Sequence, residues 1–295
     1  MYSKYRIAMQ NTYLAARSYF INNPQYLINL EEWTAKLVQT TIQTYKIEIE
    51  TDYNEASYLN PFWQNYPPED RGRAPVGDQV PWIEVGEHAV GHKLSRLISL
   101  HTKISEVGLP SGADNRFTIQ DPAIYQMTNG FTDKIMVFLD IKSVGPRDDA
   151  ENTVLSPYQV SGDGLWKNTA QGVINSQMIA QGQRASHPFY PAIPPLYVLS
   201  SGEVAPVVHV FVKPVYKMMS LQTPPVTGQP LDRIRIITLP NGLLLTQNPN
   251  YIQKYPSLIF PGKDDKKKDP SKVRCRISFD LLTTIAKWRV INITL

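Results

Sequence analysis

The hydrophobic positions of the first fifty residues recur at helical spacing. Phe20 precedes a break at Asn23-Pro24, and apolar residues then return at steps of three to five positions as far as Ile42. One face of a helix repeats at this spacing, whereas proline interrupts a helix because it lacks the amide hydrogen. The pattern therefore predicts N-terminal helices over residues 1–50.

A second pattern, that of β-strands, begins after residue 111. Residues 134–141 read KIMVFLDI, a nearly continuous apolar run that is typical of a strand buried on both faces. Further strands are indicated by apolar runs or by alternation of apolar and polar residues at 196–199, 204–215, 231–239 and 273–279. Helices followed by strands predict an α/β fold, with a mixed central β-sheet flanked by helices.

Two segments show no strong periodicity. Residues 60–82 are rich in proline, glycine and charge, which indicates a loop or crossover. Residues 148–195 are polar and also rich in glycine and proline, and predict a long loop that could form an arm. Because no internal repeat or separating linker is visible, we expect one domain over residues 1–295.

Composition and charge narrow the class of protein. The 295 residues are 42% hydrophobic and 10% aromatic, as in a globular protein. A single cysteine, Cys275, excludes an internal disulfide and a cysteine-rich zinc site. We find no long apolar run and no signal-like N-terminus, so we expect a cytoplasmic protein that does not contact a membrane. Residues 263–289 hold nine Lys or Arg and four Asp, which is typical either of a nucleic-acid-binding surface or of a solvated turn.

The end of the apolar strand at 134–141 carries candidate chemistry. Asp140 and Lys142 are two residues apart, so on a strand their side chains point to the same face. A carboxylate there can hold a hard divalent cation, and a neighbouring lysine can orient a water for attack on phosphate. The same spacing begins at Asp264 and Asp265, and taken alone it more often reflects a surface ion pair.

A metal site needs more oxygen ligands than one carboxylate supplies. Asp114 follows a turn, and a hairpin return to the strand of Asp140 would bring the two carboxylates together. The alternative is that Asp114 only forms the turn. Glu84 and Glu87 are three apart in a predicted helix over 83–100, and they could face the same site or lie on an exposed helical face.

Near the C-terminus, residues 273–280 alternate strictly between apolar and polar side chains. Arg274 and Arg276 therefore share the outward face, about 6–7 Å apart. Two arginines at this spacing can address neighbouring guanines in a major groove, although phosphate contact or a surface salt bridge would suit them equally. For Lys266, Lys267 and Lys268, phosphate contact or solvation is the simpler interpretation.

Longer stretches of the sequence resemble a known family. Asp114 together with Asp140-x-Lys142 is similar to the metal-binding signature of the PD-(D/E)xK nuclease superfamily. From about residue 50 onwards the sequence resembles the BglI family of type II restriction endonucleases, in the segments DYNEASYLNPFWQNYPP, GDQVPWIEVGEHAVG, NGFTDKIMVFLDIKSVGPRD, LSPYQVSGDG, and PGKDD followed by VRCR. Ala113 stands where the superfamily signature has proline; proline binds no metal, so we expect the site geometry to survive.

The resemblance implies an active site and a fold. It implies a PD-(D/E)xK restriction-endonuclease-like core, with the catalytic core over 83–147 and a DNA-reading turn and strand over 260–280. The resemblance further implies two Mg²⁺ ions per active site and assigns a role to each of several residues. Asp114, Asp140 and the Ile141 carbonyl would be the metal ligands, Lys142 would position the attacking water, and Glu87 would be an outer carboxylate.

The resemblance also implies a DNA sequence and partners. The family reads GCC half-sites, and the corresponding residues here are Asp148, Lys263, Asp265, Arg274 and Arg276. Arginine and lysine pair with guanine, and aspartate accepts from cytosine, so this set suits G·C pairs. We expect a homodimer that cleaves double-stranded DNA at GCCNNNNNGGC, accompanied by a cognate DNA methyltransferase in the same host.

Two alternatives stay open. A structure-specific or repair nuclease of the same superfamily would not need paired guanine-reading arginines. A non-catalytic, sequence-specific DNA-binding protein would not need a lysine two residues after the strand-end aspartate.

Overall fold

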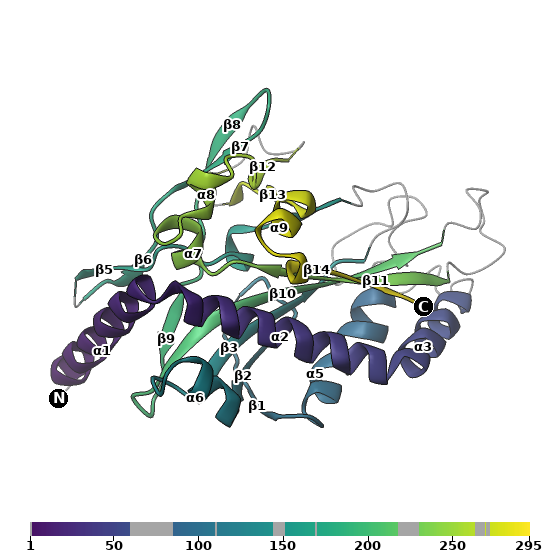
Figure 1. The fold of residues 1–295 in the computed structure, drawn as a ribbon, viewed down its shortest axis with the longest axis horizontal. Coiled ribbons are helices and arrows are strands. Elements are labelled where there is room, and N and C mark those ends of the chain that lie inside the picture. Colours follow the sequence, from purple (N-terminus) through teal and green to yellow (C-terminus); the bar gives the residue numbers. More distant parts are fainter. Residues whose placement is uncertain are drawn as a thin grey trace.

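The computed structural model describes residues 2–59, 85–109, 111–143, 151–168, 170–217, 230–262, 269 and 272–295. Three long helices open the chain, α1 (Tyr2–Asn22), α2 (Pro24–Thr44) and α3 (Lys46–Tyr58) (Figure 1). The predicted break at Asn23-Pro24 is confirmed: Asn23 leaves helical geometry, with φ −129° and ψ 63°, and proline occupies the start of α2. None of the described helices is both long and apolar enough to cross a membrane.

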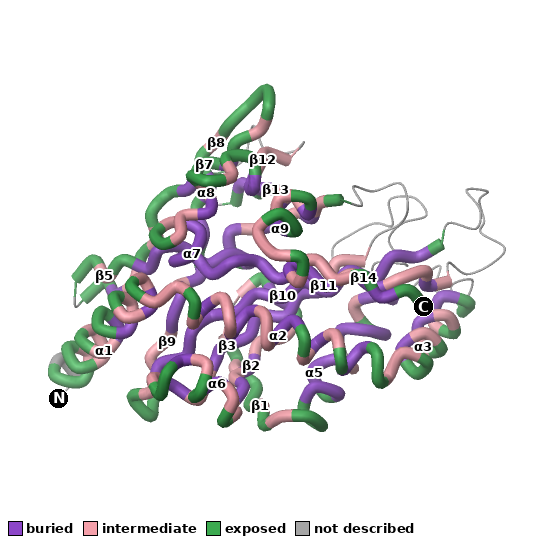
Figure 2. Tube along the Cα trace, in the orientation of Figure 1, coloured by how far each residue is buried: buried purple, intermediate pink, exposed green. Residues whose placement is uncertain are grey.

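A mixed β-sheet forms the centre of the molecule, as predicted. Its strands pair in the order β1 (Lys103–Glu106), β2 (Asn115–Gln120), β3 (Lys134–Ile141), β10 (Val204–Tyr216), β11 (Leu231–Leu239) and β14 (Val290–Thr294). The short β9 (Leu196–Val198) pairs with the start of β10. Among the paired strands that the structure describes, β3 and β10 alone run parallel. Both lie mid-sheet and are buried almost throughout (Figure 2), which explains their continuous apolar sequences.

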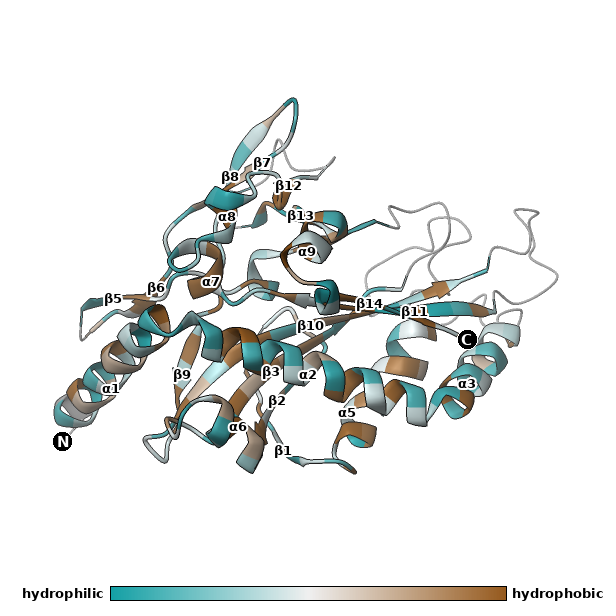
Figure 3. Ribbon diagram, viewed as in Figure 1, coloured by the Kyte–Doolittle hydropathy of each residue, from teal (hydrophilic) through white to brown (hydrophobic). Residues whose placement is uncertain are grey.

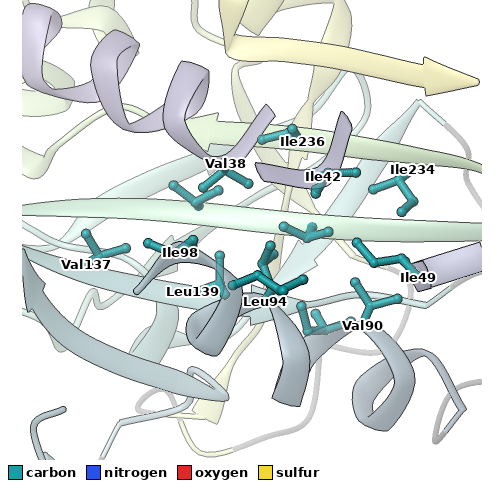
Figure 4. Packing of buried hydrophobic residues seen from close by; sticks show 14 of the residues in the cluster. Val38, Ile42, Ile49, Val90, Leu94, Ile98, Val137, Leu139, Ile234 and Ile236 are labelled. Carbon is teal, nitrogen blue, oxygen red and sulfur yellow. The ribbon is translucent and has the colours of Figure 1, made fainter. Parts of the chain in front are cut away.

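One face of this sheet is covered by helices. Helices α2, α3 and α5 (His92–Ile98) contribute the apolar side chains that meet the sheet. Figure 4 shows Val38 and Ile42 of α2 near Ile236 of β11, with Leu94 of α5 beside Leu139 of β3. Along α2 and α3 hydrophobic and hydrophilic residues alternate (Figure 3), because only one side of each helix meets the sheet.

The opposite side carries a second, three-stranded sheet. Strand β13 (Cys275–Ser278) pairs on one side with β12 (Ile259–Pro261) and on the other with β4 (Asn152–Leu155). The predicted alternation is confirmed, because Cys275 and Ile277 are buried while Arg274 is exposed. Near this sheet lie α7 (Gly242–Thr246), α8 (Tyr251–Lys254) and α9 (Phe279–Ile285), the last directly following β13 (Figure 1). The other short helical elements pack elsewhere: α6 (Pro122–Met127) contacts β3 and α2, and η7 (Lys287–Arg289) contacts β11 and β14.

The segment 148–195 differs from the long loop that its sequence suggested. Besides β4, its described part contains the short helix η5 (Pro157–Gln159) and two hairpins, β5 (Leu165–Asn168) with β6 (Gly172–Ile174) and β7 (Met178–Gln181) with β8 (Ser186–Phe189). Strands of three or four residues are too short to show clear periodicity, so the polar and glycine-rich composition dominated the prediction.

Candidate active site

The carboxyl end of β3 brings together three of the predicted site residues. The hairpin return expected before β3 is present, since β2 pairs antiparallel with it and places Asn115 opposite Leu139. Asp114, immediately before β2, accepts a hydrogen bond through Oδ2 from the Ile141 amide at 2.6 Å. Lys142 Nζ lies 2.7 Å from Asp140 Oδ2. Two carboxylates and one ammonium group thus converge at the rim of the sheet.

Asp140 is buried, with only 3% of its surface exposed. Its Oδ1 accepts a hydrogen bond from Gln159 Nε2 at 2.7 Å. Burial raises the pKa of Asp140 to about 6; the Lys142 ammonium opposes the rise, and the nearby Asp114 carboxylate adds to it. The cost of burying the negative charge of Asp140 is therefore only partly offset by Lys142 and Gln159.

The donor set fits a hard divalent cation. Oδ2 of Asp140 is buried and, among the described residues, its neighbour is the Lys142 ammonium 2.7 Å away, with which it forms an ion pair without a well-formed hydrogen bond. Mg²⁺ is commonly held by one or two carboxylates and keeps several of its waters, so Asp114 and Asp140 suffice as the protein's charged ligands. The Ile141 carbonyl directly follows Asp140 in the chain. Within the described ranges, no group of three or more His, Cys, Asp or Glu side chains forms a metal cluster.

Glu87 does not join the two aspartates in such a cluster, and its role as an outer carboxylate stays a prediction. It is half-buried in η4 (Glu87–Gly91), a π-helical turn. Glu84 lies outside the described residues. The turn packs tightly on the end of β3: a Cβ at Gly86 would collide with the Ser143 side chain, and one at Gly91 would lie 2.8 Å from Ile141 Cγ1. These glycines permit the close approach.

A further residue at the site, Gln159, was not predicted from the sequence. It ends η5 and is 6% exposed. Besides Asp140, its Nε2 donates to the Gly112 carbonyl at 3.1 Å, and its Oε1 accepts from the Ser156 amide at 2.9 Å. The available signal was the Ser-Pro-Tyr-Gln spacing of a capping box, which marks a helix start and says nothing of the distant Asp140.

Only part of the predicted DNA-reading set can be placed. Asp148, Lys263 and Asp265 lie outside the described residues. Arg274 is exposed just before β13, and Arg276 is half-buried on it. Arg276 Nη1 donates to Asn152 Oδ1 at 2.9 Å, which ties this arginine to the neighbouring strand β4.

A buried lysine links this second sheet to the central one. Lys213 is 4% exposed on β10, and its Nζ donates to the Asn152 carbonyl at 2.8 Å and lies 5.4 Å from the centre of the Phe279 ring. Since Phe211 is paired with Asp140, Lys213 lies two positions further along the same face of the sheet. In the sequence, Lys213 stands out as a charged residue within the otherwise apolar run VFVKPVY.

Comparison with known proteins gives consistent matches along the whole chain. The model of the restriction endonuclease BglI family matches residues 8–293. The type II restriction enzyme BglI of Bacillus subtilis is 49% identical over 97% of this chain and 96% of its own length. The crystal structure of restriction endonuclease BglI bound to its DNA recognition sequence superposes with a TM-score of 0.91, at 48% identity and covering 100% of this chain and 99% of that one.

A more distant structure shares only the fold. The tetrameric restriction endonuclease SfiI bound to cognate DNA gives a TM-score of 0.57 at 14% identity, covering 91% of this chain and 84% of that one.

Proposed function

Because the chain belongs to the restriction endonuclease BglI family and is a type II site-specific deoxyribonuclease, we propose that it cleaves both strands of GCCNNNNNGGC with Mg²⁺ as its cofactor. The observation that carries the catalytic part is the convergence of Asp114, Asp140 and Lys142 at the end of β3. A non-catalytic DNA-binding protein has no need of a buried carboxylate with an unpartnered oxygen beside a lysine.

In the proposed reaction a water attacks the scissile phosphorus in line with the leaving oxygen. Asp114, Asp140 and the Ile141 carbonyl would hold two Mg²⁺ ions per active site. When bound, Mg²⁺ supplies Lewis-acid stabilisation of the charge that develops on the phosphate and leaving oxygens. Lys142, with 28% of its side chain exposed, can reach the solvent side of Asp140, orient the attacking water and stabilise negative charge there.

Specificity would come from the second sheet and the turn before it. Arg274 and Arg276 are proposed to read guanines from β13, assisted by Lys263, while Asp148 and Asp265 accept from cytosine. The exposure of Arg274 and the fixed position of Arg276 beside Asn152 support these two assignments. The other three rest on the family resemblance alone.

The assembly and cellular context are proposed on the same ground. A homodimer would place one active site on each strand of the interrupted palindrome, since a twofold axis in the protein matches one in the DNA. A cognate methyltransferase in the same host would protect the host's own sites, and both proteins would act in the cytoplasm.

Metal-dependent cleavage of plasmid DNA tests the proposal. We expect discrete fragments with Mg²⁺ or Mn²⁺, DNA binding without cleavage in Ca²⁺, and no cleavage in excess EDTA. Sequencing the fragment ends should give GCC half-sites; A·T pairs at those positions would overturn the specificity. Cleavage that follows DNA structure instead of sequence would favour a repair nuclease, and binding without cleavage in any metal would favour a non-catalytic protein.

The base-reading role of Arg274 has a matched control in Lys267. Losing one bidentate arginine should cost about 1–3 kcal/mol of discrimination at a single base pair. The Lys267→Ala variant should instead weaken binding to all sequences alike and reduce the salt dependence, as expected for a phosphate contact. Substrates altered one pair at a time distinguish the two patterns. Equal, position-independent losses for both variants would show that Arg274 reads no base.

A further inference from the structure

The amide of Gln159 is fully used in hydrogen bonds inside the protein. Both of its donor positions are occupied, one by Asp140 Oδ1 at 2.7 Å and the other by the Gly112 carbonyl at 3.1 Å, while its Oε1 accepts from the Ser156 amide. A flipped amide would set its oxygen against the Asp140 carboxylate and its NH₂ against a backbone N–H. The orientation of this side chain is therefore determined by its partners.

This contact makes the two oxygens of Asp140 inequivalent. Oδ1 is bound by a neutral donor from the protein, whereas Oδ2 has no hydrogen-bond partner among the described residues and is ion-paired with Lys142. Rotation of the carboxylate about its last bond would break the bond to Gln159. The amide thus determines which oxygen remains available to a cation and in which direction it points.

The same amide also holds the segment that leads to Asp114. Gly112 lies two residues before that aspartate, and its carbonyl accepts from Gln159 while its amide donates to the Tyr158 carbonyl at 3.2 Å. A Cβ at Gly112 would lie only 3.1–3.3 Å from atoms of Ser156, Tyr158 and Gln159. Helix η5 is therefore closely packed on this turn, and one side chain connects the supports of both carboxylates.

From this geometry we infer that Gln159 is a positioning residue of the metal centre: it orients the Asp140 carboxylate and sets its separation from Asp114. This inference rests on the proposed function, because it concerns how the same site takes up a divalent cation. It also assigns a task to η5 in the segment 148–195, which is to bring an amide donor to the end of β3.

A purely structural role must be distinguished from this one. Gln159 completes the capping box of η5, in which the Ser156 side chain accepts from the backbone N–H of Gln159 and the Gln159 side chain accepts from the backbone N–H of Ser156. The Ser156→Ala variant removes half of that box without touching Asp140, and so provides the matched control. The Gln159→Met variant keeps the length of the side chain but removes every hydrogen bond of the amide.

The test measures cation affinity directly as well as through cleavage. Partners that orient metal ligands typically contribute about 10- to 100-fold to metal affinity or activity. For Gln159→Met we expect the Ca²⁺ dissociation constant, measured by calorimetry with target DNA present, and the Mg²⁺ concentration for half-maximal cleavage to rise by this factor. Saturating Mg²⁺ should restore much of the cleavage rate. Ser156→Ala should stay within about twofold of the wild type in both measurements.

Either of two results would overturn the inference: Gln159→Met that binds Ca²⁺ within twofold of the wild type, or Ser156→Ala that shifts as far as Gln159→Met. Should Gln159→Met fail to fold, Gln159→Asn serves in its place, since its amide is one methylene too short to span both partners. A wild-type protein that binds no Ca²⁺ and cleaves no DNA would instead contradict the proposed function itself.

Discussion

Two buried carboxylates in different parts of the molecule form ion pairs of the same length. Arg289 Nη2 lies 2.7 Å from Glu31 Oε2 between η7 and α2, and Lys142 Nζ lies 2.7 Å from Asp140 Oδ2 at the end of β3. What differs is the remainder of each carboxylate's surroundings. Distance alone therefore does not separate a structural pair from a functional one.

Both oxygens of the Glu31 carboxylate have partners within the protein, although Nε of Arg289 is buried without one among the described residues. Both partners are buried, and the second oxygen of Glu31 accepts from the Asn241 amide at 2.5 Å. Arg289 donates also to the Thr238 carbonyl at 3.3 Å, and its guanidinium lies 4.4 Å from the centre of the Trp288 ring. Burial raises the pKa of Glu31, an effect that Arg289 and the Asn241 amide oppose. The pair joins α2 to the end of the chain and presents no carboxylate oxygen for a ligand.

The Asp140 pair is incomplete, and this is what makes it a candidate for chemistry. One of its oxygens has no hydrogen-bond partner in the described part of the chain, Lys142 is partly exposed, and Asp114 adds a second negative charge nearby. A protein tolerates such an arrangement where a cation or substrate completes it. The comparison indicates that a buried carboxylate with one under-satisfied oxygen points to function more strongly than the presence of a salt bridge does.

The largest expected effect is on DNA cleavage, which should depend on Asp140 and not on Glu31. Replacing Asp140 with Asn keeps its shape but removes a charged metal ligand, which is worth several kcal/mol of transition-state stabilisation, so cleavage should fall by about 10³-fold or more. Glu31→Gln should leave the rate per folded molecule near that of the wild type. Plasmid cleavage at saturating Mg²⁺ measures both. Asp140→Asn cleaving within tenfold of the wild type would remove this residue from the mechanism.

The next effect separates them by stability. Arg289→Met should lower the free energy of unfolding by about 3–5 kcal/mol, because it leaves Glu31 buried and unpaired. Glu31→Leu combined with Arg289→Met should recover much of that loss, since no uncompensated charge remains. Urea unfolding followed by circular dichroism measures the two variants. If the double variant were as unstable as the single one, packing and not charge would explain the loss.

Asp140→Asn should act in the opposite direction on stability. The folded-state pKa of Asp140, about 6, exceeds the value of 3.8 for an ordinary aspartate, so the folded protein retains this proton where the unfolded chain has lost it. Stability should therefore fall as the pH rises from about 4 to about 6, and stay low above that range. In EDTA at pH 8, Asp140→Asn should be more stable than the wild type by up to about 3 kcal/mol.

Urea unfolding at two pH values checks this expectation. The gain of Asp140→Asn should shrink as the pH falls towards 4, where the carboxyl group of the folded wild type is protonated. Unfolding in Ca²⁺ instead of EDTA should narrow the gap at pH 8, because a bound cation stabilises the wild type. An Asp140→Asn protein that is less stable than the wild type at pH 8 would show that burial does not strain this carboxylate.

The sequence predicted the parts of this comparison that depend on local spacing. Strand β3 occupies the residues expected from its apolar run. Asp140 and Lys142 lie on the same face because side chains two positions apart on an extended chain point the same way. The hairpin that returns Asp114 was visible from its turn. These features depend only on residues close together in the sequence or on the pairing of two consecutive strands.

The parts that escaped prediction depend on contacts between distant segments. Glu31 and Arg289 are 258 residues apart, and neither occurs in a motif that names the other. Gln159 reaches Asp140 only because η5 packs on the turn at Gly112, which no periodicity reveals. The hairpins after residue 148 have strands too short to show alternation. Tertiary packing decided each of these features.

The smallest effect should come from a third ion pair with the same separation. Lys36 Nζ lies 2.7 Å from Glu32 Oε1 on α2, one helical turn apart, with 64% and 35% of the side chains exposed. Water screens such a pair and the long side chains lose rotamer freedom, so Lys36→Ala should change the free energy of unfolding by only about 0.3–0.5 kcal/mol, with cleavage unaltered. A loss as large as that of Arg289→Met would mean that the nitrogen–oxygen distance, and not burial, determines the strength of these pairs. A second measurement repeats the unfolding at higher salt concentration, where the contribution of the exposed pair should decrease while that of Arg289 and Glu31 persists.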